Sequence, residues 1–287
     1  VARFCMALFL FAGEGAHSAS PDLTILKTSP SWAAADAVLQ NLLGRTLDEF
    51  LTSESGNHAA PASPLVTTLF NILHADLWRQ WGHEPAYALG HSIGEVAAAY
   101  VAGVVGLEET LVLAHTLGQV AAELPGAMLH TILPAASVAT FPSKNLHLAA
   151  INAAVAGVGD DALPSPDVSV TLCGAERHVA EWLSTDEAAS KLMPGHPWHH
   201  PAYRTTAAFA KFSAAAKPAV KPVAKSAGGA DGGRCTFISA TKVAALEAVD
   251  VAHWEAWLTQ PVQFAAALAK VAELAAGAPL YAVQTGP

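Results

Sequence analysis

The sequence has only three cysteines, Cys5, Cys173 and Cys235. An odd number at wide spacing does not form a disulfide framework, and it lacks the paired short spacing of a structural zinc site. We therefore expect no bound metal and no disulfide. A reducing, cytoplasmic compartment fits this cysteine usage.

Charged residues and long apolar runs are also scarce. Charged side chains make up 14% of the chain, and the net charge is −9. Nucleic acid is not expected as a partner, because phosphate binding needs a basic face. No apolar run reaches the roughly 18 residues that span a bilayer. The chain opens without Met and without a basic-then-apolar leader, so we expect a segment of a longer polypeptide that does not enter a membrane.

What the sequence does contain is a large apolar fraction, 52% of 287 residues. That is enough for one large domain or a core with a smaller insert. Apolar runs and breaker residues predict strands over Phe4–Ala12, Met128–Leu133, Leu146–Ile151, Val168–Leu172, Cys235–Ala240 and Leu280–Val283. Helical spacing predicts helices over Ala33–Leu43, Leu47–Leu51, Leu65–Trp81, Ile93–Ala102, Leu107–Leu124, Arg177–Leu183, Val251–Leu258 and Val262–Ala276.

The order of these elements indicates the architecture. Strands that alternate with helices predict an α/β fold with a mostly parallel sheet and helices on both faces. Between 127 and 196 the pattern changes to short strands with one helix, which indicates an inserted α+β subdomain. The large subdomain would comprise 1–126 and 197–287. Surface loops are expected over Ala153–Pro166 and Ala214–Gly233.

The chemistry centres on Gly90-His91-Ser92-Ile93-Gly94-Glu95. An apolar run ends there and an Ala-rich helical pattern begins. This is the context of a nucleophile elbow, in which a strand turns sharply into a helix and exposes the serine. From the residues alone, a helix-capping serine stays an alternative.

A serine nucleophile needs a base, and the chain has 13 histidines. The most unusual setting is His196-Pro197-Trp198-His199-His200-Pro201, where two prolines restrict the backbone. A rigid loop would hold a base in place. A solvated loop histidine is the alternative that local sequence leaves open.

Four stretches in order resemble the malonyl-CoA:acyl carrier protein transacylase family, which includes the acyltransferase domains of polyketide and fatty acid synthases. They are Phe11-Ala12-Gly13-Glu14-Gly15, the Gly90–Glu95 motif running into Gly103, Trp198-His199-His200-Pro201, and Gln260-Pro261-Val262-Gln263-Phe264. The resemblance implies an α/β-hydrolase-like core with an inserted ferredoxin-like subdomain. It also implies a Ser–His pair steadied by main-chain carbonyls.

Residue roles follow from the resemblance. Ser92 would carry the acyl group and His199 would act as base and then acid. The N–H groups of Ile93 and Glu14 would form the oxyanion hole. Most relatives have Gln where Glu14 stands. Because the donor is the main-chain N–H, the Glu14 carboxylate is tolerated if it points away from the developing charge, which it would otherwise oppose. Residues expected to shape the substrate pocket or hold the histidine loop are His91, Asn152, His196, Trp198 and Gln260.

One departure bears on the substrate. Relatives that accept malonyl groups clamp the free carboxylate with an Arg on the helix after the elbow, and an ungapped count places Leu117 there. Without the bidentate Arg, burying a carboxylate is costly. By contrast, Ile93 and the His196–His199 tetrad resemble the malonyl type. We expect an uncharged acyl group, such as acetyl or another starter unit, and keep a malonyl-specific enzyme as the alternative.

The resemblance implies acyl-CoA as donor, the phosphopantetheine thiol of an acyl carrier protein as acceptor, and no permanently bound cofactor. Neighbouring synthase domains would be further partners. A hydrolase that clears acyl groups from carriers, and a degenerate structural block, stay open as alternatives. A basic patch for the acidic carrier is the hypothesis for Lys211, Lys217, Lys221 and Lys225.

Overall fold

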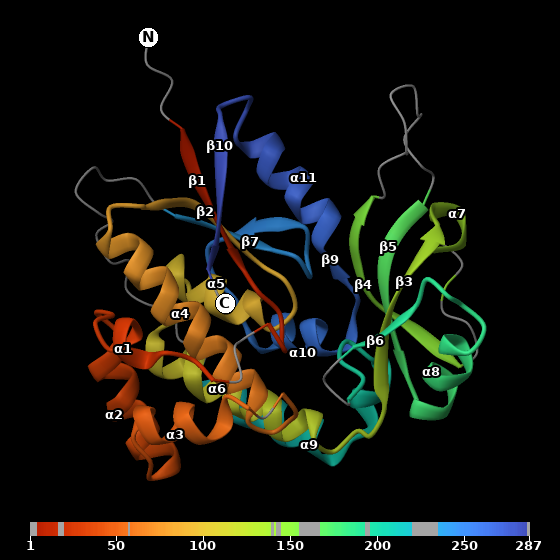
Figure 1. The fold of residues 1–287 in the computed structure, drawn as a ribbon, viewed down its shortest axis with the longest axis horizontal. Coiled ribbons are helices and arrows are strands. Elements are labelled where there is room, and N and C mark those ends of the chain that lie inside the picture. Colours follow the sequence, from red (N-terminus) through yellow and green to blue (C-terminus); the bar gives the residue numbers. More distant parts are fainter. Residues whose placement is uncertain are drawn as a thin grey trace.

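The computed structural model describes residues 5–16, 20–56, 58–138, 141, 145–154, 167–192, 196–219 and 235–285, and of residues 214–219 only the backbone. Its strands form two sheets that lie side by side (Figure 1). Both sheets have five strands. The first has the order β10-β1-β2-β7-β8 and the second β6-β3-β5-β4-β9. An α/β architecture with a second sheet is therefore confirmed.

The first sheet is mostly parallel, as predicted. It consists of β1 (Met6–Phe11), β2 (Pro85–Gly90), β7 (Thr236–Ser239), β8 (Ala244–Leu246) and β10 (Leu280–Thr285). The pairs β1–β10, β1–β2 and β2–β7 are parallel, and β7–β8 at one edge is antiparallel. The carboxyl ends of the central strands consequently meet at one edge, where ligands bind in open α/β sheets.

Helices cover both faces of this sheet because the central strands are apolar on both sides. Phe9, Ala88 and Phe237 belong to a core shared with several helices. Leu8, Leu89 and Ile238 point the other way, into a second core with α11 (Phe264–Leu274). The helices on the first face include α2 (Trp32–Leu43), α3 (Leu47–Glu54), α4 (Ser63–Gln80), α5 (Gly94–Val101), α6 (Leu107–Ala121) and α10 (Val251–Thr259).

The second sheet comprises β3 (Ala127–Pro134), β4 (Leu146–Ala154), β5 (Asp167–Gly174), β6 (Ser190–Leu192) and β9 (Val262–Gln263). Its pairings are antiparallel except β4–β9. Helix α8 (Glu176–Leu183) packs Val179 onto its apolar face, and α7 (Ala135–Val138) follows β3. The boundaries at 127 and 196 stay a prediction, and β9 joins this sheet from outside them.

Several sequence expectations need correction. The predicted helix over Val262–Ala276 starts with β9, because Val262 pairs with Ala150, and α11 begins at Phe264. The loop expected from Ala214 is helical to Ala219, since α9 spans Ala207–Ala219. Ala153 and Ala154 end β4. The rest of both expected loops, 155–166 and 220–233, lies outside the described residues. Other short elements were not predicted, namely α1 (Leu23–Leu26), α7, β6, the 3-10 turn η1 (Pro201–Thr205) and β8.

Candidate active site

The elbow between β2 and α5 has the predicted strand, turn and helix. Ser92 has a φ of 52°, in the left-handed region that side chains other than glycine rarely adopt. Gly94 permits the turn, because a Cβ there would lie 2.3 Å from the carbonyl oxygen of Phe11. At Gly90 a Cβ would lie 2.1 Å from the backbone nitrogen of Glu95. The two glycines are therefore required by close backbone approach.

Ser92 meets a histidine 107 residues further along the chain. Its Oγ lies 2.8 Å from Nε2 of His199, and both side chains are buried. The other ring nitrogen, Nδ1, lies 2.7 Å from the carbonyl oxygen of Trp257. A carbonyl only accepts, so Nδ1 carries the hydrogen and Nε2 is left to accept from the serine. This tautomer is the one that a general base requires.

Trp257 holds both partners in place. Its carbonyl lies in the last turn of α10, where helix carbonyls have no partner within the helix. His199 supplies that partner, and the Trp257 indole Nε1–H donates to the Ser92 carbonyl at 3.1 Å. Sequence reasoning missed Trp257. The available signal was a tryptophan in the last turn of a helix that ends at the Gln260-Pro261 motif.

Burial keeps His199 neutral. Loss of solvation lowers the pKa of His199 from 6.5 to about 4, against the opposing effect of the Trp257 carbonyl, and nearby His91 adds a smaller decrease. His199 is consequently unprotonated near pH 7 and able to accept a proton.

The neighbouring His200 faces elsewhere. Its Nδ1 accepts from the backbone N–H of Ala202 at 3.0 Å, and its ring centroid lies 4.2 Å from that of His147. Of the two adjacent histidines, His199 is therefore the one that pairs with Ser92.

A small cavity of about 80 Å³ opens beside Ser92. Its wall combines apolar and polar side chains. The lining residues are Gly13, Glu14, His91, Ser92, Met128, Ala150, Thr171, Leu192, Trp198 and His199. Since drug-sized ligand pockets measure roughly 300–1,000 Å³, this cavity suits a short chain.

Two backbone N–H groups near Ser92 have no hydrogen-bond partner among the described residues: that of Glu14, which lines the cavity, and that of Ile93, the residue after Ser92. The first belongs to the loop after β1, which Asn71 of α4 holds in place. The Asn71 Nδ2 donates to the Ala12 carbonyl at 2.9 Å, and its Oδ1 accepts from the Ala12 N–H at 3.3 Å. Asn71 was not singled out from the sequence, because nothing local distinguishes it from other helical residues.

The carboxylate of Glu14 turns toward the loop that carries His199. Its Oε2 accepts from Nε2 of His196 at 3.1 Å and from the indole Nε1 of Trp198. The side chain is 2% exposed. Its Oε1 is buried with no hydrogen-bond partner among the described residues. Glu14, His196 and Trp198 thus form one buried cluster at the cavity wall.

His91 and Asn152 also meet. Nε2 of His91 lies 2.8 Å from Oδ1 of Asn152, whose Nδ2 donates to Thr171 Oγ1 at 3.2 Å. The His91 ring packs edge-on against Phe264, and burial lowers the pKa of His91. These contacts join the elbow to β4 and β5 of the second sheet.

Two predicted pocket residues lie away from the cavity. Leu117 is fully buried in the core on α6 and is not part of the cavity lining. Gln260 is exposed at the carboxyl end of α10. Of the lysines proposed for the carrier, Lys211 is exposed on α9, and the side chains of Lys217, Lys221 and Lys225 lie outside the described residues.

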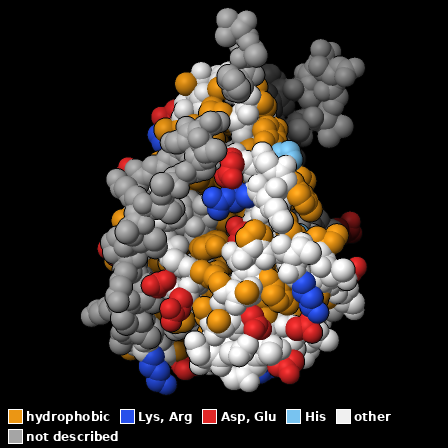
Figure 2. All heavy atoms as spheres, turned by 90° about the vertical axis from the view of Figure 1, so that its left-hand side faces the viewer, with side chains coloured by type: hydrophobic (Ala, Val, Ile, Leu, Met, Phe, Trp, Pro, Cys, Tyr) orange, Lys and Arg blue, Asp and Glu red, His pale blue; other side chains and the backbone are white. Residues whose placement is uncertain are grey.

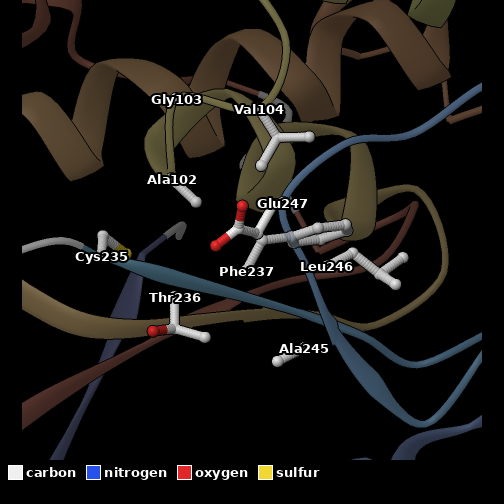
Figure 3. Close-up of a pocket in the computed structure, with 9 residues that line it drawn as sticks. All are labelled: Ala102, Gly103, Val104, Cys235, Thr236, Phe237, Ala245, Leu246 and Glu247. Atoms are coloured by element: carbon white, nitrogen blue, oxygen red, sulfur yellow. The ribbon is translucent and has the colours of Figure 1, made fainter. Parts of the chain in front are cut away.

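Larger hollows exist elsewhere, and neither Ser92 nor His199 lines the two described next. One of about 330 Å³ lies between α1 and α4, on the face where Figure 2 shows hydrophobic side chains among charged ones, and includes the exposed Ile25 and Trp81. Another, of about 260 Å³, is drawn in Figure 3 with the carboxylate of Glu247 among the residues that line it. It includes Thr236, which pairs with Tyr87 toward the amino end of β2, whereas Ser92 follows the carboxyl end.

The described residues contain neither a candidate metal site nor a candidate membrane-spanning helix. No group of three or more His, Cys, Asp or Glu side chains is placed to hold a metal ion among them. Within the same residues, no helix is both long and apolar enough to cross a membrane.

Known proteins resemble this chain in sequence and in fold. Residues 8–155 match the family model described as the acyl transferase domain. The chain is 30% identical over 207 residues to the spectinabilin polyketide synthase system protein NorB of Streptomyces orinoci, covering 67% of this chain and 9% of that protein. It is 31% identical over 190 residues to the highly reducing polyketide synthase resH of Aspergillus sclerotiorum, covering 60% and 7%. The chain thus spans less than a tenth of these relatives.

Solved structures share the fold. The malonyl CoA-acyl carrier protein transacylase of Burkholderia pseudomallei superimposes with a TM-score of 0.77 at 17% identity, covering 99% of this chain and 94% of that one. A loading acyltransferase from the avermectin modular polyketide synthase gives 0.73 at 22% identity, covering 98% and 87%. Because the family model matches more than half of the chain and includes the elbow, this protein belongs to the family of acyl transferase domains.

Proposed function

We propose that this chain transfers an uncharged acyl group from acyl-CoA to the phosphopantetheine thiol of an acyl carrier protein, through an ester on Ser92. The observation that carries the proposal is the buried hydrogen bond of 2.8 Å between Ser92 Oγ and His199 Nε2. Membership of the acyl transferase family supports transfer as the reaction. The Burkholderia protein of similar fold is named a malonyl CoA-acyl carrier protein transacylase, which supports a carrier protein as the acceptor.

In the first half-reaction, His199 Nε2 takes the Ser92 hydroxyl proton while Oγ attacks the thioester carbonyl. The negative oxygen that forms would accept from the N–H groups of Ile93 and Glu14. The C–S bond then breaks, and the CoA sulfur leaves with the proton from Nε2. The Trp257 carbonyl stabilises the transient imidazolium through the Nδ1–H bond of 2.7 Å, a task that a carboxylate performs in Ser-His-Asp triads.

In the second half-reaction, the carrier thiol gives its proton to His199 and attacks the ester on Ser92. The C–O bond breaks, and Ser92 Oγ regains the proton from Nε2. No permanently bound cofactor is needed, because each step moves one proton and one acyl group.

The uncharged acyl group is inferred from the cavity wall. Among its described lining residues there is no Lys or Arg, and position 117 holds Leu. A buried acyl carboxylate would have no cationic partner there, which is costly. Neighbouring synthase domains are proposed as partners, since the polyketide synthase relatives are more than ten times longer than the matched region.

The test is intact-mass labelling with acetyl-, propionyl-, malonyl- and methylmalonyl-CoA, each supplied separately. We expect an adduct of the acetyl or propionyl mass that disappears in Ser92→Ala. A preference for malonyl would contradict the uncharged substrate. If no acyl-CoA labels the protein, the domain is a structural block. A burst of CoA release that then stalls supports transfer, whereas sustained release of free acid identifies a hydrolase.

A further inference from the structure

The cavity beside Ser92 contains one acidic side chain. Glu14 lines it together with Ser92 and His199, and the carboxylate is almost completely shielded from solvent, with 2% of the side chain exposed. Charge at such a position is poorly screened, because water and ions do not reach it.

The contacts of Glu14 leave one oxygen free. Trp198 and His196 both donate to Oε2, and Oε1 is buried without a hydrogen-bond partner among the described residues. An unpartnered buried carboxylate oxygen keeps a negative potential at the wall of the cavity.

No Lys or Arg occurs among the described residues that line the cavity, and burial lowers the pKa of its two lining histidines, His91 and His199. His196 is not among the lining residues, and it contacts Oε2 rather than the unpartnered Oε1. The cavity is also small, about 80 Å³. An acyl group on Ser92 Oγ therefore has little room in which to move a distal carboxylate away from Glu14. The two negative charges would lie within the few ångströms over which like charges oppose each other.

We propose that Glu14 determines acyl specificity by excluding carboxylated acyl groups from the Ser92 cavity through charge repulsion. The inference rests on the proposed acyl-Ser92 chemistry. It gives a cause for the preference for uncharged acyl groups that is distinct from Leu117, which lies in the core and outside the cavity lining.

The experiment is a competition. Protein is mixed with equal concentrations of acetyl-CoA and malonyl-CoA, and the two Ser92 adducts are quantified by intact mass. In Glu14→Gln, which keeps an oxygen to accept from His196 and Trp198, the malonyl-to-acetyl ratio should rise at least about tenfold over wild type, or about 1.4 kcal/mol. Because both adducts form in one tube, a partly inactive preparation does not change the ratio.

Two variants serve as controls. Glu273→Gln removes a carboxylate that is 68% exposed on α11 and should leave the ratio unchanged. Glu14→Asp keeps the charge and should keep the acetyl preference. A ratio in Glu14→Gln within twofold of wild type overturns the proposal.

A measurement on the wild type covers the case in which Glu14 variants do not fold. Acetoacetyl-CoA has the shape of malonyl-CoA with an uncharged methyl in place of one carboxylate oxygen. Wild type should form the acetoacetyl adduct at least about tenfold faster than the malonyl adduct, and equal rates would overturn the charge argument. Failure of the proposed function would differ, as no acyl-CoA would label Ser92.

Discussion

The pH dependence of Ser92 acylation tests whether His199 is the base in the buried state described here. His199 must be neutral to accept the serine proton. Burial lowers its pKa from 6.5 to about 4. At pH 5.5 a histidine with a pKa of 4 is about 97% neutral, whereas one with a pKa of 6.5 is about 9% neutral. The structure therefore predicts roughly tenfold faster acylation at pH 5.5 than an ordinary histidine would allow.

The assay is the single-turnover rate of acyl-Ser92 formation, followed by rapid quench and intact mass from pH 4 to 8. The acidic limb should have its midpoint near pH 4. Circular dichroism at each pH separates loss of activity from unfolding. His200→Asn is the matched control, because burial also lowers the pKa of His200 to about 4 while His200 does not touch Ser92. Asn can still accept from the Ala202 N–H, so the limb should not move. A midpoint near 6.5 in wild type refutes the assignment.

The same shift has a consequence for stability. The folded-state pKa of His199 lies below the unfolded value, so the unfolded chain binds the proton more tightly and stability falls as pH decreases from about 6.5 to 4. The difference of 2.5 units (6.5 − 4) corresponds to at most about 3 kcal/mol. The free energy of unfolding, measured with urea, should change less between pH 7 and pH 4.5 in His199→Gln than in wild type. An equal change in the two proteins would contradict the linkage.

Three further predictions follow from contacts in and around the site. Trp257→Phe removes the donor to the Ser92 carbonyl. It should lower the free energy of unfolding in urea by about 1–3 kcal/mol and slow acylation. An unchanged free energy of unfolding and acylation rate would show that the indole does not hold the elbow. Asn71→Ala frees the Ala12 backbone and, by displacing the Glu14 N–H, should slow acylation on the order of 100-fold without moving the acidic limb; a full rate would exclude this loop from oxyanion stabilisation. Glu95→Ala leaves the hydroxyls of Ser239 and Thr241 without their buried acceptor and should cost about 3 kcal/mol or more in thermal or urea unfolding, and a wild-type unfolding midpoint would contradict that estimate.

Much of the fold followed from local pattern. The apolar run before Gly90 and the Ala-rich run after Gly94 predicted the elbow. Hydrophobic periodicity and the glycines that interrupt it are local properties of the sequence. Elements that depend on distant partners were missed or displaced. β9 is only two residues long and exists because Val262 pairs with Ala150. The Ala-rich sequence near Ala214 has a composition shared by helices and loops, and α9 continues to Ala219.

The sequence by itself determined the nucleophile motif, the candidate histidine pair and the absence of an Arg at 117. These features depend only on residue identity and order, which can be read from the sequence. The resemblance already assigned His199 as the base and implied a main-chain carbonyl as its support. Tertiary structure alone showed the contact between His199 and Ser92, identified the carbonyl as that of Trp257, and placed Glu14 against His196 and Trp198. Each of these contacts joins residues at least 58 positions apart, so no local propensity encodes it, and packing of β2, α10 and the 196–200 loop brings them together.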